Sequence, residues 1–162
     1  MFERYSLAAE RAARLAQSEA RRLGHNMTGP EHLAVGLIAD EREPASAALR
    51  SFGLDRDRLR RAAGAVHPPE APGASVAVPP FNAAAQGLIE TARRDALNAG
   101  RAGVEPADLL LALLDDDAGV AVLGTAGVDA GRARQAVQRI RSSIPVTSSV
   151  VGEPPVAGSG DG

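Results

Sequence analysis

Residues 5–12 read Tyr-Ser-Leu-Ala-Ala-Glu-Arg-Ala, and residues 81–88 read Phe-Asn-Ala-Ala-Ala-Gln-Gly-Leu, an offset of 76 residues. The register continues through turn-forming residues, at offsets of 76 and then 74: Gly24 with Gly100, Pro30 with Pro106, and Gly53 with Gly127. Two copies of one unit therefore make up most of the chain. Because a unit of this size has little core of its own, we expect two half-domains that bury their apolar faces against each other about a pseudo-two-fold axis.

The hydrophobic pattern within each copy predicts helices. Apolar residues recur at helical spacing between Ser6 and Leu23, which indicates one long amphipathic helix closed by Gly24. Pro30 is expected to begin the next helix, because its missing N–H needs no partner at a first helical position. Further helices are predicted over residues 44–51 and 55–66 and, after a counterpart of the long helix, over residues 106–114, 119–125 and 129–142. The predicted fold is all-α, an eight-helix bundle of two four-helix repeats.

The domain organisation follows from the repeat. We expect one domain over residues 1–142, with repeat one at 1–66 and repeat two at 81–142. Residues 67–80 are rich in proline and small residues, which predicts a linker without helix. Residues 143–162 mix Pro, Gly, Ser and Val with little capacity for burial, and we expect them to form a disordered tail.

Composition excludes several classes of function. The chain has no cysteine, so thiol catalysis and cysteine-based zinc sites are excluded, and its 18 basic residues are all arginine, so a P-loop lysine is absent. A net charge of −2 gives no electrostatic reason to bind nucleic acid or an anionic membrane. The N-terminus has no apolar run typical of a signal peptide. We expect a cytoplasmic, monomeric protein that is not an enzyme and has no cofactor.

One motif in the first copy is distinctive: residues 24–37 read Gly-His-Asn-Met-Thr-Gly-Pro-Glu-His-Leu-Ala-Val-Gly-Leu. They resemble the Gly-His-Asn-Tyr-Ile-Gly-Thr-Glu-His-Ile-Leu-Leu-Gly-Leu signature of the Clp N-terminal domain, the paired repeat at the front of ClpC- and ClpA-type unfoldases. The resemblance covers residues 1–142 and is weaker in the second copy. It implies an eight-helix pseudo-two-fold bundle that recognises substrates and adaptors for a Clp protease. The AAA+ modules of those unfoldases are missing here, so we expect a stand-alone protein, with a piece of a longer unfoldase as the alternative.

The resemblance also implies a binding site for phosphorylated arginine. In ClpC-like members a glutamate pairs with the guanidinium, while nearby backbone and hydroxyl groups hold the phosphate, and Glu31 matches that glutamate here. The candidate binding residues for phosphoarginine or peptide are Glu31, Thr28, His32 and Glu105. In the second copy Ala107 stands at the aligned position, and Glu105 lies two residues before it. Glu31 has a structural alternative, a carboxylate that complements the helix dipole.

Two further groups of residues are candidate sites. His25, Glu31 and His32 have ligand-type side chains, but their spacing lacks a third strong ligand, so we expect buried or capping roles and no metal. Phe2 and Phe81 occupy positions that, in the resembled domain, flank an exposed apolar patch for partners or peptide-like small molecules. Core packing is the alternative for both.

The leading hypothesis is a non-catalytic protein-binding module that modulates Clp-dependent proteolysis. Its expected partners are Clp protease components, adaptors or substrate proteins, which it either delivers or competes for. The alternative hypothesis is a protein that sequesters peptide-like small molecules, such as cyclic peptide antibiotics that target Clp N-domains, through Phe2 and Phe81. No combination of residues points to an enzyme.

Overall fold

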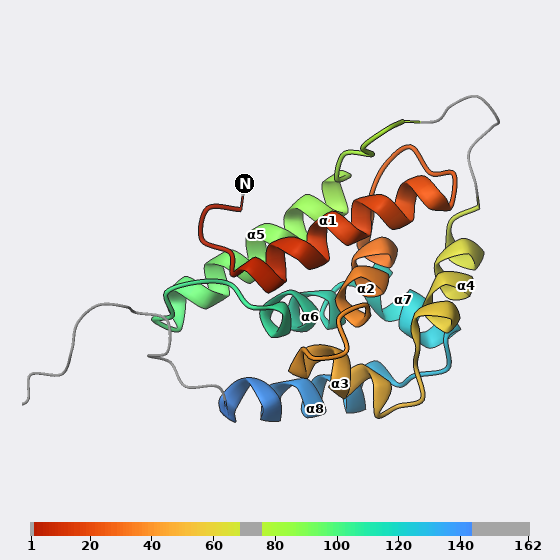
Figure 1. The fold of residues 1–162 in the computed structure, drawn as a ribbon. Helices are drawn as coiled ribbons and strands as arrows, with labels where there is room; N and C mark the ends of the chain where they lie inside the picture. Colours follow the sequence, from red (N-terminus) through yellow and green to blue (C-terminus); the bar gives the residue numbers. More distant parts are fainter. Residues whose placement is uncertain (1, 69–75, 144–162) are drawn as a thin grey trace, which may run out of the picture.

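The computed structural model describes residues 2–68 and 76–143 (Figure 1). This part of the chain contains eight helices and no strand, which confirms the predicted all-α fold. The helices are α1 (Leu7–Arg22), α2 (Pro30–Ile38), α3 (Pro44–Arg50), α4 (Arg56–Val66), α5 (Ala83–Asn98), α6 (Pro106–Leu114), α7 (Asp117–Thr125) and α8 (Ala130–Ser143). Within the described residues, none of these helices has the length and apolar character needed to cross a membrane.

The helix ends lie close to where the sequence predicts them, because capping residues set them. Ser6 and its counterpart Asn82 accept hydrogen bonds from the backbone N–H groups of Ala9 and Ala85, at 3.1 and 2.9 Å. Pro30 and Pro106 are the first residues of α2 and α6, as expected. Positive φ angles follow α1, α3, α5 and α7 at four glycines: Gly24, Gly53, Gly100 and Gly127.

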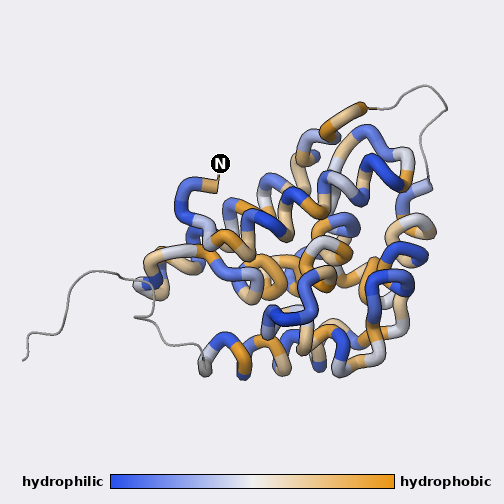
Figure 2. The backbone as a smooth tube through the Cα atoms, in the orientation of Figure 1, coloured by the Kyte–Doolittle hydropathy of each residue, from blue (hydrophilic) through white to orange (hydrophobic). Residues whose placement is uncertain are grey.

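The centre of the bundle is formed by α2 and α6, the second helix of each repeat (Figure 1). Every residue of α2 is buried, and α6 is buried except for Leu111. Both α1 and α5 pack against this central pair. Figure 2 shows the hydrophobic stretches gathered in the middle and the hydrophilic ones on the outside. The core is therefore built mainly from the leucine, alanine and valine side chains on the inner faces of these helices.

The two repeats are joined crosswise. The start of the first repeat pairs with the loop before α6, where Ser6 N–H donates to the Val104 carbonyl at 2.9 Å. The start of the second repeat pairs with the loop before α2, where Asn82 N–H donates to the Thr28 carbonyl at 2.9 Å. In the same way α3 packs against α8, and α4 packs against α7. Each repeat completes the fold of the other, as the predicted pseudo-two-fold arrangement requires.

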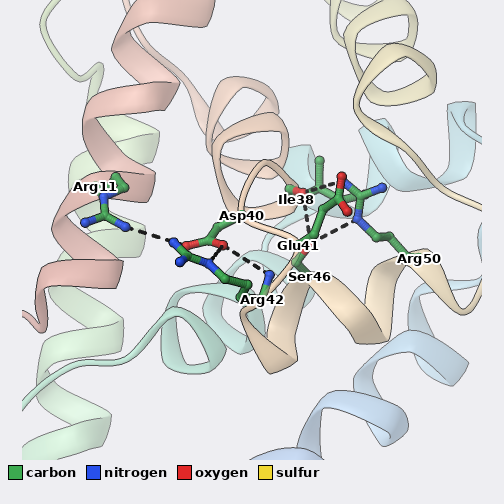
Figure 3. A network of polar contacts seen from close by, with 7 residues as sticks. All are labelled: Arg11, Ile38, Asp40, Glu41, Arg42, Ser46 and Arg50. Carbon is green, nitrogen blue, oxygen red and sulfur yellow. Dashed lines mark hydrogen bonds and ion pairs between the residues drawn. The ribbon is translucent and has the colours of Figure 1, made fainter.

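A polar network fixes the end of α2 (Figure 3). Asp40 lies 3.6 Å from Arg11 of α1 and accepts hydrogen bonds from the backbone and side chain of Arg42, which lower its pKa. The Ser46 hydroxyl and the Arg50 guanidinium both donate to the Ile38 carbonyl, at 2.8 and 2.9 Å. These contacts tie α1, α2 and α3 together at the end of α2 away from its first turn.

The predicted domain boundaries stay predictions. The described parts of the linker, residues 67–68 and 76–80, contain no helix. The predicted tail lies outside the described residues except for Ser143, the last residue of α8.

Candidate functional site

The predicted site lies at the first turn of α2, where His32 caps the helix. Its ring Nδ1 accepts a hydrogen bond from the Gly29 backbone N–H at 2.9 Å. The second repeat has the same cap, because Asp108 Oδ2 accepts from the Glu105 N–H at 2.9 Å. Position 32, or 108 in the second copy, must therefore carry an acceptor, and an imidazole nitrogen and a carboxylate both meet that need.

His25 and His32 form a buried pair with a defined arrangement of protons. His25 Nδ1 lies 2.6 Å from His32 Nε2, and both side chains are almost completely buried. Because His32 Nδ1 accepts the Gly29 amide, a neutral His32 carries its proton on Nε2 and donates it to His25. Burial lowers the pKa of His32 to about 4, against the opposing charge of Glu31, so this ring is neutral at neutral pH.

Glu31 is bound by a histidine that lies outside the motif of residues 24–37. His67, the residue that follows α4, has its Nδ1 2.7 Å from Glu31 Oε2. Its ring also stacks on His25, with centroids 4.0 Å apart and planes 7° from parallel. Glu31 is only 7% exposed, whereas the His67 side chain is 30% exposed and covers the carboxylate from outside. We call His25, Glu31, His32 and His67 the histidine cluster.

The other predicted site residues lie elsewhere. Thr28 is fully buried, and its hydroxyl donates to the Pro79 carbonyl at 2.7 Å, so it belongs to the seam between the repeats. Glu105 is half-buried at the start of α6, in the place that Gly29 has in repeat one. The pKa of Glu43 is raised, mainly by burial and further by the charge of Glu105. The structure therefore brings Glu31 and His32 together and places Glu105 in the other repeat.

The second repeat has a charged counterpart of the histidine cluster. The offsets of 76 and 74 residues pair His25 with Arg101, His32 with Asp108 and His67 with Arg141. In the structure Arg101 contacts Asp108 Oδ1, and Arg141 Nε donates to the same oxygen at 2.6 Å. We refer to these three residues as the Arg–Asp–Arg triad. The repeat register pairs these positions in sequence, and the contact of Arg141 with Asp108 in the structure identifies His67 as the equivalent member of the site in repeat one.

The predicted aromatic patch is partly core. Phe81 is buried, while Phe2 is half-buried and packs edge-on against Phe81 and Tyr5, with ring centroids 6.1 and 5.1 Å apart. The guanidinium carbon of Arg14 lies 5.9 Å from the centroid of the Phe2 ring. Arg14 also lines two grooves along α1, of about 340 and 530 Å³. Leu7, which lines the smaller groove, is 79% exposed.

Comparison with known proteins identifies the fold and the family. Residues 4–78 and 80–159 match the family model of the Clp repeat (R) N-terminal domain. The chain is 32% identical over 155 residues to the negative regulator of genetic competence ClpC/MecB of Bacillus subtilis, covering 94% of this chain and 19% of that protein. The chain thus spans less than a fifth of the length of this relative.

Solved structures show the same fold. The N-terminal domain of the chaperone ClpD from Arabidopsis thaliana superposes with a TM-score of 0.74 at 24% identity, over 88% of this chain and 97% of that one. A ClpV N-domain, solved in complex with a VipB peptide, superposes with a TM-score of 0.63 at 17% identity, over 86% and 88% of the two chains. The Clp N-domain is a non-catalytic binding domain in its family. The chain belongs to the Clp repeat N-terminal domain family.

Proposed function

We propose that this Clp N-domain is a recognition module that binds client or adaptor proteins of a Clp machine, and that Glu31 binds the guanidinium of phosphorylated arginine on such clients. By engaging these proteins it would alter Clp-dependent proteolysis. The observation that carries the proposal is the hydrogen bond between His67 and Glu31. An imidazole N–H occupies, on the carboxylate of the first turn of α2, the position that a guanidinium N–H would take.

The surroundings of Glu31 favour an arginine-like ligand. Its Oε1 lies beside Gly29, where an added Cβ would come within 2.4 Å of that oxygen, so the glycine leaves room for the carboxylate. The positive end of the α2 dipole lies at the same turn and favours a phosphate. Because His67 follows the end of α4 and is partly exposed, its ring can turn away from Glu31, which breaks its stacking on His25.

The proposal predicts one site per chain. In repeat two Ala107 replaces the glutamate, and Asp108 is held by two arginines. Calorimetric titration of the metal-free protein with phosphoarginine should therefore give a stoichiometry near one. Glu31→Gln should abolish binding because it removes the charge that pairs with the guanidinium. His67→Ala should bind more tightly because it removes the group that competes for Oε2.

Two controls make the test decisive. Unphosphorylated arginine should bind much more weakly, because it lacks the phosphate that the dipole favours. Glu105→Gln should leave the affinity unchanged, because that residue lies in the other repeat. Equal heats for wild type and Glu31→Gln, in variants with unchanged circular dichroism, would reject Glu31 as the binding residue.

A second candidate function is capture of peptides or cyclic peptides at Phe2, and the exposure of Leu7 beside the α1 grooves favours it. An apolar ligand would cover Leu7 and the Phe2 ring, and Arg14 would flank it. Phe2→Ala and Leu7→Gln should each weaken binding of a fluorescent cyclic peptide, measured by anisotropy. Val120→Gln, at an exposed site on α7, is the matched control. Undiminished affinity in both variants would exclude this patch.

A further inference from the structure

All three histidines of this chain lie in one place. Together with Glu31 they form the histidine cluster, in which one ligand-type atom from each residue lies within 4.8 Å of every other. The four residues come from three segments: the loop after α1, the first turn of α2 and the residue after α4. We propose that the histidine cluster binds one divalent metal ion of the zinc class.

The donor set fits that class of ion. Imidazole nitrogens and one carboxylate oxygen are ligands of Zn²⁺ and its neighbours, whereas Mg²⁺ and Ca²⁺ require sites made of oxygen. His25 and His32 are held rigidly, since the first follows the α1 terminus with its N–H bonded to the Ala20 carbonyl and the second lies within α2. A site with two fixed ligands and a partly exposed third, His67, has both order and an entry path.

The geometry consists of two hydrogen-bonded pairs side by side. His25 Nδ1 and His32 Nε2 are 2.6 Å apart, His67 Nδ1 and Glu31 Oε2 are 2.7 Å apart, and the stacking of His25 on His67 joins the pairs. Ligands of a tetrahedral zinc ion, at bond lengths of about 2.0–2.2 Å, lie roughly 3.3–3.5 Å from each other. Each pair therefore has to open by less than an ångström as the metal takes the place of the shared protons.

The protons balance without net release. His25 already presents a lone pair on Nδ1. When His32 ligates through Nε2, its proton moves to Nδ1, and when His67 ligates through Nδ1, its proton moves to Nε2. Besides the two hydrogen bonds that the metal replaces, the bond from the Gly29 N–H is lost, because this N–H then faces a protonated Nδ1. This loss gives metal binding a specific signature at the Gly29 amide.

The second repeat shows that the fold does not need this cluster for a cap. The Arg–Asp–Arg triad performs the same capping with two arginines that cannot ligate a metal, because guanidinium groups stay protonated. The three histidines and the carboxylate in the equivalent place of repeat one are thus more than is needed to cap the helix. The contrast also predicts one metal ion per chain.

The metal site does not rest on the proposed function, although both use Glu31. A bound metal ion would occupy the carboxylate that phosphoarginine needs, so the two ligands would compete. The two proposals also predict opposite effects for one variant. His67→Ala should weaken metal binding and strengthen phosphoarginine binding, so the failure of either proposal can be recognised separately.

The experiment titrates Co²⁺ and then Zn²⁺ into tag-free, chelator-treated full-length protein. We expect one equivalent of Co²⁺ to give the intense visible absorption of a tetrahedral site, and one equivalent of Zn²⁺ to remove it. His67→Ala and Glu31→Gln should each weaken Zn²⁺ affinity by at least about tenfold, measured by calorimetry. Asp117→Asn, an exposed carboxylate on α7, is the matched control and should bind like wild type.

A second measurement does not depend on any variant. In ¹H–¹⁵N NMR spectra one equivalent of Zn²⁺ should shift the Gly29 amide and leave the Glu105 amide, its counterpart in repeat two, unchanged. Absence of stoichiometric binding at millimolar metal would overturn the proposal. So would affinity that is unaffected by both His67→Ala and Glu31→Gln, or lost equally in Asp117→Asn.

Discussion

Glu19 illustrates how a single buried charge is accommodated in a core of alanine and leucine. It is 3% exposed on α1, and its carboxylate accepts hydrogen bonds from Arg60 at 2.9 and 2.6 Å and from Arg56 at 3.4 Å. Burial by itself raises the pKa of Glu19, but the hydrogen bond and charge of Arg60 outweigh it, and the resulting pKa lies below the usual value. The carboxylate thus ties α4 to α1 in its ionised form.

This arrangement predicts a stability that falls in acid. Because the folded pKa is below the unfolded one, the stabilisation is present above about pH 5 and is lost as pH falls through the folded pKa. Glu19→Gln should lower the free energy of unfolding at pH 7 by about 2 kcal/mol and flatten its dependence on pH below 5. Urea denaturation at a series of pH values measures both effects.

The control for this prediction is Glu41→Gln, whose carboxylate is 77% exposed and 3.9 Å from Arg50. It should leave stability nearly unchanged because exposed pairs contribute little. If the free energy of unfolding fell as steeply below pH 5 in Glu19→Gln as in wild type, the assignment of acid sensitivity to Glu19 would be contradicted.

At the scale of elements, the approach of α1 to α2 depends on one glycine. A Cβ built on Gly36 would lie 2.2 Å from the Ala12 carbonyl oxygen and 3.0 Å from the Ala16 nitrogen, both backbone atoms of α1. Backbone of a packed helix cannot give way as a side chain can, so the two helices would have to separate. The small residues of α1, Ala9, Ala12, Ala13 and Ala16, make the same close contact possible from the other side.

Gly36→Ala should therefore destabilise the protein by about 1–3 kcal/mol through overpacking. The matched control is Gly87→Ala in α5, where an added Cβ meets nothing within 4 Å. This variant should stabilise the protein by up to about 1 kcal/mol, because alanine is the better helix former. Thermal unfolding of the two variants should give shifts of opposite sign, and a stabilising Gly36→Ala would refute the close packing of α1 on α2.

At the scale of the whole molecule, neither repeat is complete alone. The start of each repeat is paired with a loop of the other, and α4 and α8 pack against α7 and α3 of the opposite repeat. Separating the repeats would expose the buried faces of α2 and α6, which carry several of the largest fully buried side chains, among them Leu33, Leu37, Leu109 and Leu113.

Fragments 1–78 and 79–143 should accordingly show little helix by circular dichroism when separate. Mixed in equal amounts, they should regain the helical signal of the intact protein, because their complementary faces bury each other. Mixing two copies of the same fragment is the control. A stable helical fold in either fragment alone would show that the cross-repeat contacts are not required.

Much of this architecture could be predicted from the sequence because it depends on local or periodic signals. The helix starts at Pro30 and Pro106, the caps at Ser6 and Asn82, and the turn at Gly24 are readable one residue at a time. The repeat register then joins these elements into two equivalent units. The fold class follows from such patterns and the family from the resemblance of residues 24–37, and the structure and comparisons confirm both.

The candidate site was only half predictable. Glu31 and His32 lie within one motif, so a resemblance found them, whereas His67 is 36 residues from Glu31, within the predicted linker. Thr28 is a candidate from the same motif, and the bond of its hydroxyl to Pro79 depends on a segment 51 residues away. Distances of this kind are set by how the helices pack, and no local pattern encodes them.

The sequence by itself determined the helices, their ends and the duplication, because hydrogen bonding within helices and hydrophobic periodicity act over a few residues, and the motif at residues 24–37 indicated the family by resemblance. Only the tertiary structure decided that the three histidines meet around Glu31 in one repeat, while an Arg–Asp–Arg triad takes the same place in the other. The physical reason is that the packing of α4 on α2, two helices distant in the chain, brings His67 back to the first turn of α2.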